Sequence, residues 1–524
     1  RQAWGLEVTQ RAYRAACPNC GAPVEFASAA SASAVCSYCK STLVRDGEAL
    51  TRIGVVGELF DDHSPLRLGA AGQLQGQPFA LVGRLQYGYA DGTWNEWHAL
   101  FDNGRSGWLS EDNGAYVFAF DTTLSQAPAL DTLRAGQRVT VGGQAWDVAS
   151  VVVAKLLSAE GELPAPPKLA GGFGVVDLRN PLGEVGTLDF SRTPPTWSIG
   201  RSVALSELAL TGLADTSEKT LKGRGVECPS CGSALDVKLS TTQSLACPQC
   251  RAVVDLSGGV GAELRHYAQN NSGPGGLEPQ IALGKTGTLA LGGTPLPWQA
   301  VGFMERCTAD GDDETFYWRE YLLWNRSAGF AFLVDSEDGW SWVRPITGAP
   351  AQKGDGARWQ GADYRRKESY GARVTWVQGE FYWRVQRDER ALVADYVGVG
   401  LAVKKRLSRE QTGNEVTWSA GETLAASQVA QAFGLAAPAA LARDSGPVAA
   451  AKGVRTLIVL FVLLFLVVVL FSRCGGDNCD EVRATFGPAS AEYQQCQRNR
   501  SSGSGSGRSG GSFGGWSSGG GGHK

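Results

Sequence analysis

The chain has 524 residues, more than one hydrophobic core usually supports, so it is expected to fold as several domains. Its net charge of −3 and its isoelectric point near 6.0 lack the basic excess with which proteins hold a phosphate backbone, so nucleic-acid binding is disfavoured. With only 4 histidines, the histidine-based forms of catalysis are also disfavoured.

Two elements with the same cysteine spacing open the two halves of the chain. Each contains two Cys-x-x-Cys pairs, and 15 residues separate the pairs in both elements. Four thiolates at this spacing are typical of a tetrahedral zinc site and leave no coordination position open for chemistry. Disulfides would instead need an oxidising compartment, and a redox dithiol needs only one such pair. We therefore predict two structural zinc ions, held by Cys17, Cys20, Cys36 and Cys39 in a ribbon over residues 14–45, and by Cys228, Cys231, Cys247 and Cys250 in a ribbon over residues 225–256.

Residues 54–210 form the first predicted β module. Apolar side chains alternate from Phe79 to Tyr89, which is the two-residue period of a strand with one buried face. Turn signals at Asp91-Gly92 and Asn103-Gly104 separate this strand from two further ones, as in a β-meander. Other expected features of the module are strands over 139–148 and 151–157, a break at 161–164, and one short helix over 206–213.

A second module, over residues 276–431, repeats the first. The agreement in order and spacing indicates a duplicated unit rather than a short-period solenoid, because Cys228 follows Cys17 by 211 residues. The predicted fold is mainly β, with two zinc ribbons alternating with two β-barrel-like or sandwich-like modules. The matching positions are Leu68-Gly69 with Leu283-Gly284, Val82-Gly83 with Val301-Gly302, Trp94-x-Glu96-Trp97 with Trp318-x-Glu320-Tyr321, Gly161-Glu162-Leu163 with Gly379-Glu380-Phe381, Asp177 with Asp395, and Thr196-Trp197-Ser198 with Thr417-Trp418-Ser419.

Three motifs of the first module, the Trp-Asn-Glu-Trp run at 94–97, the Gly-Trp-Leu-Ser-Glu segment at 107–111 and the Gly-Glu-Leu-Pro run at 161–164, resemble a bacterial domain of unknown function, family 4178. The resemblance covers most of residues 17–431 as two tandem copies, each preceded by a zinc-ribbon-like element. The second copy departs more, with Tyr321 in place of Trp97. The resemblance implies no activity, because none is established for the family. It implies genes for polyamine-type enzymes and small membrane proteins as neighbours.

An apolar stretch follows the second module. Arg455 and Arg473 bracket 17 uncharged residues, which as a helix would span about 25 Å. A buried core helix is the alternative, but an all-apolar helix after the last module has no core to enter. We predict a transmembrane helix over 454–472, with the N-terminal bulk in the cytoplasm and the tail over 473–524 outside, rich in Gly and Ser and disordered. Basic residues favour this orientation weakly, and the tail holds Cys474, Cys479 and Cys496 outside the zinc pattern.

Glu96 and Glu320 are the most plausible positions for chemistry. Each lies two residues after a tryptophan, so the carboxyl and the indole project from the same strand face. A carboxyl against an indole could act as a general acid, but the favoured interpretation is a glutamate that accepts structural hydrogen bonds, and the sequence supplies no nucleophile–base pair. No catalytic residue is therefore assigned. Candidate ligand-binding residues are Trp94, Glu96, Trp97, Trp318, Glu320 and Tyr321, while Ser206 and Ser427 are interpreted as helix caps, Asp177 and Asp395 as strand-end residues, and Cys307 as a buried thiol.

The function favoured by these features is a membrane-anchored, zinc-binding scaffold that recruits an unidentified protein partner to the cytoplasmic face of the membrane. This hypothesis is favoured over an enzyme by metal sites that leave no coordination position open, by the duplicated β surfaces and by the predicted transmembrane helix. The alternative is an enzyme or ligand-binding subunit, with an aromatic and glutamate pocket that would suit a polyamine-like cation.

Overall fold

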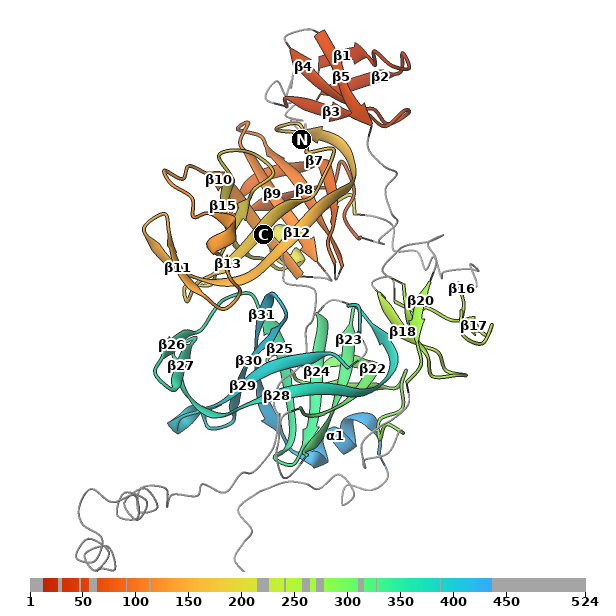
Figure 1. Cartoon of the computed structure of the whole chain (residues 1–524), viewed down its shortest axis with the longest axis vertical. Coiled ribbons are helices and arrows are strands. Elements are labelled where there is room, and N and C mark those ends of the chain that lie inside the picture. Colours follow the sequence, from red (N-terminus) through yellow and green to blue (C-terminus); the bar gives the residue numbers. More distant parts are fainter. Residues whose placement is uncertain are drawn as a thin grey trace, which may run out of the picture.

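The computed structural model describes residues 13–26, 31–46, 49–55, 64–90, 92–112, 115–213, 226–239, 242–256, 264–269, 278–309, 315–326, 328–386 and 388–435. Within them the chain is mainly β, as predicted, and forms two barrels (Figure 1). We call residues 64–213 barrel 1 and residues 278–435 barrel 2. The small cysteine-bearing sheets beside them are ribbon 1, residues 13–55, and ribbon 2, residues 226–267.

Barrel 1 is a closed ring of eight antiparallel strands. In ring order these are β7 (Gln77–Gly88), β8 (Thr93–Phe101), β9 (Ser106–Asp112), β10 (Ala115–Thr122), β15 (Thr196–Ser202), β14 (Glu184–Asp189), β13 (Phe173–Arg179) and β12 (Gln144–Leu163), which pairs back with β7. Outside the ring lie β6 (Ala71–Leu74), β11 (Arg138–Val141) and the short 3₁₀ helices η1 (Leu130–Thr132) and η2 (Leu205–Leu208).

Barrel 2 repeats this ring strand for strand. Its order is β22 (Leu296–Thr308), β23 (Tyr317–Asn325), β24 (Gly329–Ser336), β25 (Gly339–Ile346), β31 (Glu415–Leu424), β30 (Lys405–Thr412), β29 (Arg390–Gly398) and β28 (Ala362–Phe381), which closes on β22. Outside the ring lie β21 (Thr286–Leu289), β26 (Ala351–Lys353), β27 (Gly356–Trp359), η3 (Gly400–Ala402) and α1 (Ala426–Phe433). The internal duplication seen in the sequence is therefore a duplication of topology.

A strand of 20 residues organises each copy. The first half of β12 pairs with β13 and its second half with β7, so the strand bends across the barrel. Near the C-terminal end of β12, Gly161 has a φ of +70°, and a Cβ there would lie 2.2 Å from the carbonyl oxygen of Val82. Gly379 of β28 has the same conformation, with a φ of +82°. The predicted break at 161–164 is wrong for its first three residues, because β12 continues through Gly161 to Leu163 and ends directly before Pro164. The register shift of β12 against β7 lies earlier, between Leu156 and Ser158.

The two faces of the barrel wall are buried against different partners. Arg306 on β22 contacts Glu410 on β30, and because these strands are not ring neighbours, the contact crosses the barrel interior. The outer face of barrel 2 is covered in part by α1, where Phe433 packs with Trp298 and Trp340. In barrel 1 the residue that occupies this outer position is Leu208 of η2. The interior of each barrel is thus enclosed on all sides by its own strands.

Each ribbon continues the sheet of the barrel that follows it. In ribbon 1 the strand β3 pairs with the end of β12, and in ribbon 2 the strand β18 pairs with the end of β28. Two further strands extend each sheet outward, while a separate two-stranded hairpin carries the first cysteine pair. The ribbon strands are β1 (Tyr13–Ala16), β2 (Pro23–Phe26), β3 (Ser33–Val35), β4 (Ser41–Asp46) and β5 (Ala49–Val55), and β16 (Val226–Glu227), β17 (Ala234–Leu235), β18 (Ser244–Ala246), β19 (Val253–Asp255) and β20 (Arg265–Tyr267).

The barrels are joined to each other through backbone hydrogen bonds. Ser150 of β12 pairs with Glu415 of β31, and the amide of Val151 donates to the carbonyl of Asn414 at 3.1 Å. Beside this joint the amide of Ala349 donates to the carbonyl of Asn180 at 3.3 Å. The two barrels are therefore joined by one strand pair and neighbouring backbone hydrogen bonds, and not by the connecting chain alone.

Two predictions about helices have different outcomes. The stretch over 206–213 is only the 3₁₀ turn η2, and neither Ser206 nor Ser427 is a cap, because Ala204 and Ala425 occupy the cap positions. Gln428 supplies the cap of α1 instead, since its Oε1 accepts from the amide of Ala425 at 2.9 Å. The predicted transmembrane helix over 454–472 lies outside the described residues. Among those that are described, no helix combines the length and the apolar character needed to cross a bilayer.

Candidate metal centres and polar barrel interiors

The eight predicted zinc ligands come together as two groups of four sulfur atoms. In each group all Sγ atoms lie within 4.8 Å of one another. A zinc–sulfur bond of about 2.3 Å in a tetrahedron places the sulfurs roughly 3.8 Å apart. The measured Sγ–Sγ distances are 3.7 Å for Cys17 with Cys39 and for Cys20 with Cys36, and 3.7 Å for Cys228 with Cys250 and 3.8 Å for Cys231 with Cys247. Both groups therefore have the size of a four-thiolate zinc site.

The cysteine hairpins are built alike. The residue after each second cysteine is in the left-handed region, and its amide donates back to the carbonyl of the first cysteine. Gly21 and Gly232 fill this position in the first hairpins, as expected, with φ of +77° and +75°. In the second hairpins Lys40 and Arg251 adopt the same conformation. These turns hold the two thiolates of each pair close together.

Glu380 joins ribbon 2 to barrel 2. Its carboxylate accepts hydrogen bonds from the amide of Lys238 at 3.1 Å, the amide of Leu239 at 2.9 Å and the hydroxyl of Thr242 at 2.6 Å. Glu380 is 5% exposed and lies in the repeated Gly-Glu-Leu/Phe motif, directly beside the β18 pairing. The motif that was predicted to interrupt a strand instead carries the side chain that anchors the metal-bearing loop.

Replacing Glu380 with alanine should loosen ribbon 2 from barrel 2 at a cost of about 1–3 kcal/mol, because three donors lose a buried acceptor. Hydrogen exchange of the amides of Lys238 and Leu239 should accelerate, and zinc content should stay the same. Glu305→Ala is a matched control, since Glu305 is also a buried carboxylate of barrel 2 but bonds to Thr375. Equal exchange in both variants would contradict the anchoring role.

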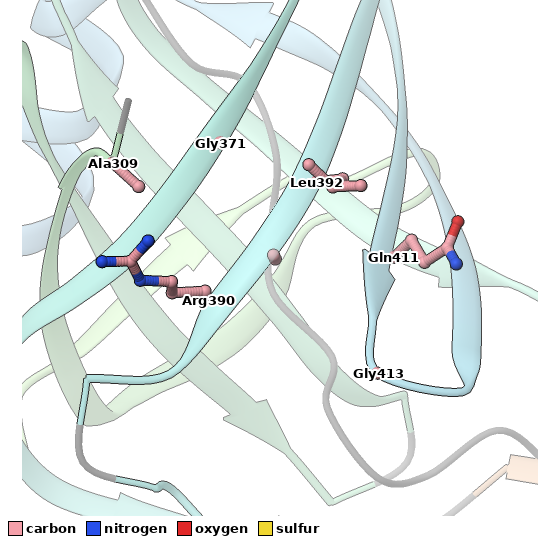
Figure 2. Close-up of a pocket in the computed structure, with 7 residues that line it drawn as sticks. Ala309, Gly371, Arg390, Leu392, Gln411 and Gly413 are labelled. Atoms are coloured by element: carbon pink, nitrogen blue, oxygen red, sulfur yellow. The ribbon is translucent and has the colours of Figure 1, made fainter. Parts of the chain in front are cut away.

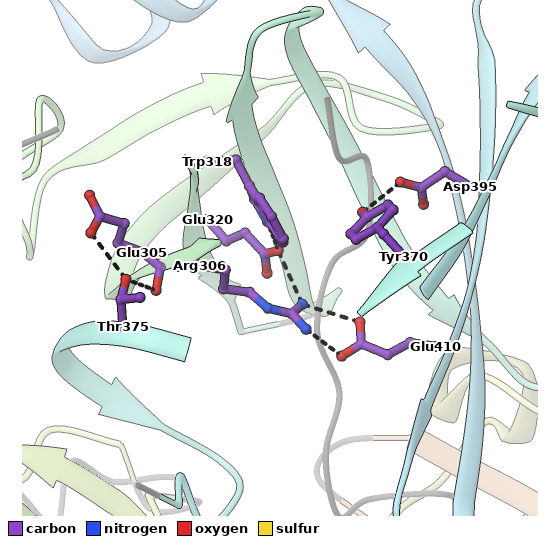
Figure 3. Close-up of polar contacts among 8 residues, drawn as sticks. All are labelled: Glu305, Arg306, Trp318, Glu320, Tyr370, Thr375, Asp395 and Glu410. Carbon is purple, nitrogen blue, oxygen red and sulfur yellow. Dashed lines mark hydrogen bonds and ion pairs between the residues drawn. The ribbon is translucent and has the colours of Figure 1, made fainter. Parts of the chain in front are cut away.

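The interior of barrel 2 contains a buried ion cluster (Figure 3). The guanidinium of Arg306 donates to Glu320 at 3.3 Å and to both oxygens of Glu410, at 3.2 and 2.8 Å. The indole of Trp318 also donates to Glu320, at 2.7 Å, so indole and carboxyl share one strand face as predicted. Arg306 is 0% exposed and Glu320 is 1% exposed. Glu320 is therefore held by donors from within the barrel.

The protonation of this cluster follows from burial and charge. Burial raises the pKa of Glu410 to about 7, and the neighbouring carboxylates of Glu320 and Asp395 add to this rise although Arg306 opposes it. Burial alone would lower the pKa of Arg306, but the carboxylates of Glu410 and Glu320 outweigh it and keep the guanidinium charged. The cluster thus contains the charged guanidinium of Arg306 among carboxylates, and one of these, Glu410, has a pKa of about 7.

Asp177 and Asp395 are not at strand ends, as the sequence analysis proposed. Both lie inside their strands, β13 and β29, and both are 0% exposed. Asp177 accepts from the hydroxyls of Thr187 at 3.0 Å and Ser150 at 3.4 Å, and Asp395 accepts from the hydroxyl of Tyr370 at 2.8 Å. They lie at equivalent positions of the two rings, where each connects neighbouring strands from the interior.

The comparisons with known proteins agree with this duplicated architecture. The family model described as "Domain of unknown function (DUF4178)" matches residues 67–205 and again residues 291–426, which are the two barrels. The chain belongs to this family. No curated protein and no solved structure matches it. The resemblance inferred from the tryptophan and glycine motifs is confirmed as two tandem DUF4178 copies.

The two DUF4178 copies differ at the position of the interior cation. The strand registers place Tyr87 of the first copy where the second has Arg306, and Asp189 where the second has Glu410. Burial raises the pKa of Tyr87 well above its usual value, and the charges of Glu96 and Asp189 raise it further. Tyr87 therefore lies in the field of both carboxylates. The first DUF4178 copy has a phenol where the second has a guanidinium.

The candidate ligand-binding residues are divided between the two faces of each DUF4178 barrel. Trp94 and Glu96 lie on the inner face and bond to each other at 3.3 Å. Trp97 lies on the outer face, where its indole donates to Glu111 at 3.0 Å, and Tyr321 is the equivalent outer residue of the second copy. Trp318 and Glu320 are on the inner face of that copy. The six residues thus form two interior pairs and two separate outer residues.

Glu111 is a buried carboxylate that was not among the residues predicted from the sequence. Its carboxylate accepts from the hydroxyls of Ser64 at 2.6 Å and Tyr116 at 3.3 Å, the amide of Asn95 at 3.3 Å and the indole of Trp97. With four donors the carboxylate is held in place as a structural group. It belongs to the Gly-Trp-Leu-Ser-Glu motif, so this contact gives a physical reason for the motif's last residue.

A surface pocket of 210 Å³ lies on the second DUF4178 copy (Figure 2). Arg390, Gln411 and the exposed side chain of Leu392 line it, together with Ala309 and Gly371. None of these residues takes part in the Arg306 cluster.

His98 and Cys307 also lie outside that cluster. Burial lowers the pKa of His98, and its Nε2 lies 2.9 Å from the hydroxyl of Ser106. Cys307 is buried, as predicted.

Proposed function

We propose that this protein is a zinc-stabilised scaffold that holds two DUF4178 barrels at a membrane and presents them to a protein partner. The observation that carries the proposal is how the buried carboxylates are used. Glu111, Glu320, Glu380 and Glu410 are each held by two or more donors of the protein itself. Carboxylates that accept hydrogen bonds from several protein donors fix the positions of the barrel strands and are poorly placed to transfer protons to a substrate.

The metal groups support the same proposal. Four thiolates saturate a zinc ion, so a metal at either site would stabilise its ribbon and would not activate water. Because β3 and β18 extend the barrel sheets, such a metal would also stiffen the edge of each barrel. Membrane attachment is proposed from the apolar stretch between Arg455 and Arg473, with the ribbons and barrels in the reducing cytoplasm.

The decisive experiment is a variant in which both Glu96 and Glu320 are replaced with glutamine. If the protein is a scaffold, a partner cross-linked to the wild-type chain in cells should be recovered in equal amount with this variant, provided that its zinc content and thermal stability are preserved. A folded variant that still binds the partner but loses the cellular function would favour an enzyme instead.

A ligand-binding subunit is the second candidate, because barrel 2 already holds a cation between carboxylates. The guanidinium of Arg306 lies between Glu320 and Glu410, and its Cζ is 5.6 Å from the ring of Trp318. An amine of the polyamine class would need the same surroundings. Calorimetric titration of the full chain with spermidine distinguishes the candidates, since a scaffold should give no saturable heat.

A further inference from the structure

The turn between β29 and β30 of barrel 2 exposes three large apolar side chains within five residues. Val399 is 54% exposed, Val403 is 63% exposed and Leu401 is fully exposed at 108%. Exposed apolar residues elsewhere in the described part of the chain are mostly single, as is normal for a protein surface, or lie on the outermost strand of ribbon 1. A convex turn with this composition needs a partner that can surround its tip.

The turn is held rigidly. The amide of Val399 donates to the carbonyl of Asp363 at 2.9 Å, and the amides of Ala402 and Val403 donate back into the turn at 3.2 and 3.3 Å. A Cβ on Gly398 would lie 1.9 Å from the carbonyl oxygen of Ala402, so this position requires glycine. Because the backbone is fixed, the apolar side chains lose little conformational entropy when they are covered.

Positive charge lies next to the apolar tip. Lys404 and Lys405 follow Val403 directly, and the exposed Arg365 lies on the adjacent strand, opposite Val397. The acidic groups nearby are Glu422, across from Lys405, and Asp363, which is paired with Arg358 at 3.6 Å. An excess of basic groups therefore surrounds the turn, and this complements an anionic surface.

The turn lies beside the C-terminal end of β31, the last strand of barrel 2. The amide of Thr423 donates to the carbonyl of Lys404 at 2.9 Å, and α1 begins only three residues later, at Ala426. The described residues end at 435, and the apolar stretch begins at 456, so about 20 residues connect them and can reach roughly 70 Å when extended. A bilayer that holds the apolar stretch is therefore within reach of the turn.

The equivalent turn of barrel 1 has a different environment. It runs from Asn180 to Glu184, exposes one large apolar side chain, Leu182 at 79%, contains no lysine, and contacts barrel 2 through the carbonyl of Asn180 and the amide of Ala349. The group of three apolar side chains followed by two lysines thus belongs to the second copy alone, the one that precedes the apolar stretch. It is not a requirement of the shared fold.

We propose that Val399, Leu401 and Val403 insert into the headgroup region of an anionic lipid bilayer, with Lys404 and Lys405 contacting the lipid phosphates. A fluid bilayer can surround a convex apolar tip, whereas a protein surface would need a matching cavity. The insertion would give barrel 2 a second membrane contact and a fixed orientation on the bilayer. This inference rests on the proposed membrane attachment.

The test is photo-cross-linking of the full chain in vesicles, with p-benzoylphenylalanine placed at Leu401 or, as a matched control, at Leu392. Leu392 is 61% exposed and lies at the other end of β29. In vesicles containing phosphatidylglycerol, lipid adducts should form at position 401 several times more often than at 392. Lys404→Glu and Lys405→Glu should each lower the adduct yield about fivefold, as should pure phosphatidylcholine vesicles.

Equal lipid labelling at 401 and 392 would overturn the proposal, and so would adducts from 401 to a second copy of the chain or to another protein. Membrane attachment is measured separately, as resistance of the vesicle-bound chain to carbonate extraction. A chain that resists extraction but gives no adduct at 401 refutes the turn alone. A chain that carbonate removes refutes the transmembrane anchor, and the adduct yield at 401 still decides the role of the turn.

Discussion

Replacing Arg306 with methionine is expected to destabilise barrel 2 by about 3–5 kcal/mol, because buried carboxylates lose the cation that faces them. Glu320 and Glu410 both accept hydrogen bonds from its guanidinium, and Glu410 is 3% exposed. The loss should be measured as a lower denaturant midpoint of the full chain. The content of metal should be unchanged, since Glu320 and Glu410, which accept from this guanidinium, belong to barrel 2 and not to a ribbon.

Two control variants separate the charge effect from a loss of packing. Arg306→Met combined with Glu320→Gln and Glu410→Leu removes the cation together with its partners and should recover much of the stability. Arg306→Tyr combined with Glu410→Asp reproduces the pair found in barrel 1, Tyr87 and Asp189, and should also be better tolerated than methionine alone. If the single methionine variant is as stable as the wild type, the cluster has no stabilising role.

Serine in place of Cys247 is expected to remove one of the two proposed zinc ions and to unfold ribbon 2. A structural zinc in a four-cysteine site contributes on the order of 10 kcal/mol of apparent binding free energy, and a ribbon of this size has little core to replace it. Elemental analysis should fall from two zinc ions per chain to one. Because β18 pairs with β28, protection of the β28 amides from hydrogen exchange should fall as well.

Cys307→Ala provides the control for this variant. Cys307 is a buried cysteine of barrel 2, the barrel that adjoins ribbon 2, and it belongs to neither sulfur group, so its replacement should leave the metal content unchanged. Cys36→Ser should remove the other proposed zinc ion and unfold ribbon 1, while ribbon 2 stays folded. A wild-type chain that binds far fewer than two zinc ions would show that the sulfur groups serve another purpose.

The features that the sequence predicted well are those set by short spacings. The two cysteine groups follow from hairpins whose partners are three residues apart. The alternation from Phe79 to Tyr89 does predict a strand, β7, but not a single buried face: the register shifts between Leu81 and Gly83, so Phe79 and Leu81 pack outside the barrel and Leu85 and Tyr87 inside it. Trp94 with Glu96 and Trp318 with Glu320 also meet as a two-residue period requires. The duplicated topology was also predictable, because motifs that recur in the same order and spacing imply that both copies have the same fold.

The features that escaped prediction depend on contacts between distant strands. Gly161 looks like a turn residue in the sequence, and only the approach of β7 shows that it lies within a strand and pairs with Gly83. Arg306 interrupts an otherwise apolar strand face, and its partner Glu410 is 104 residues away. Glu380 could not be assigned either, because the three donors that surround it lie about 140 residues earlier in the chain.

The strand contact between Ser150 and Glu415 has a consequence for how a partner would recognise this protein. Ribbon 1 continues the sheet of barrel 1, ribbon 2 continues that of barrel 2, and the barrels are bonded to each other. The path from one sulfur group to the other therefore passes through paired strands rather than through a hinge. A molecule that touched both ribbons would therefore bind two sites that are linked through paired strands, and a change at the pairing of Ser150 with Glu415 would alter the path between them.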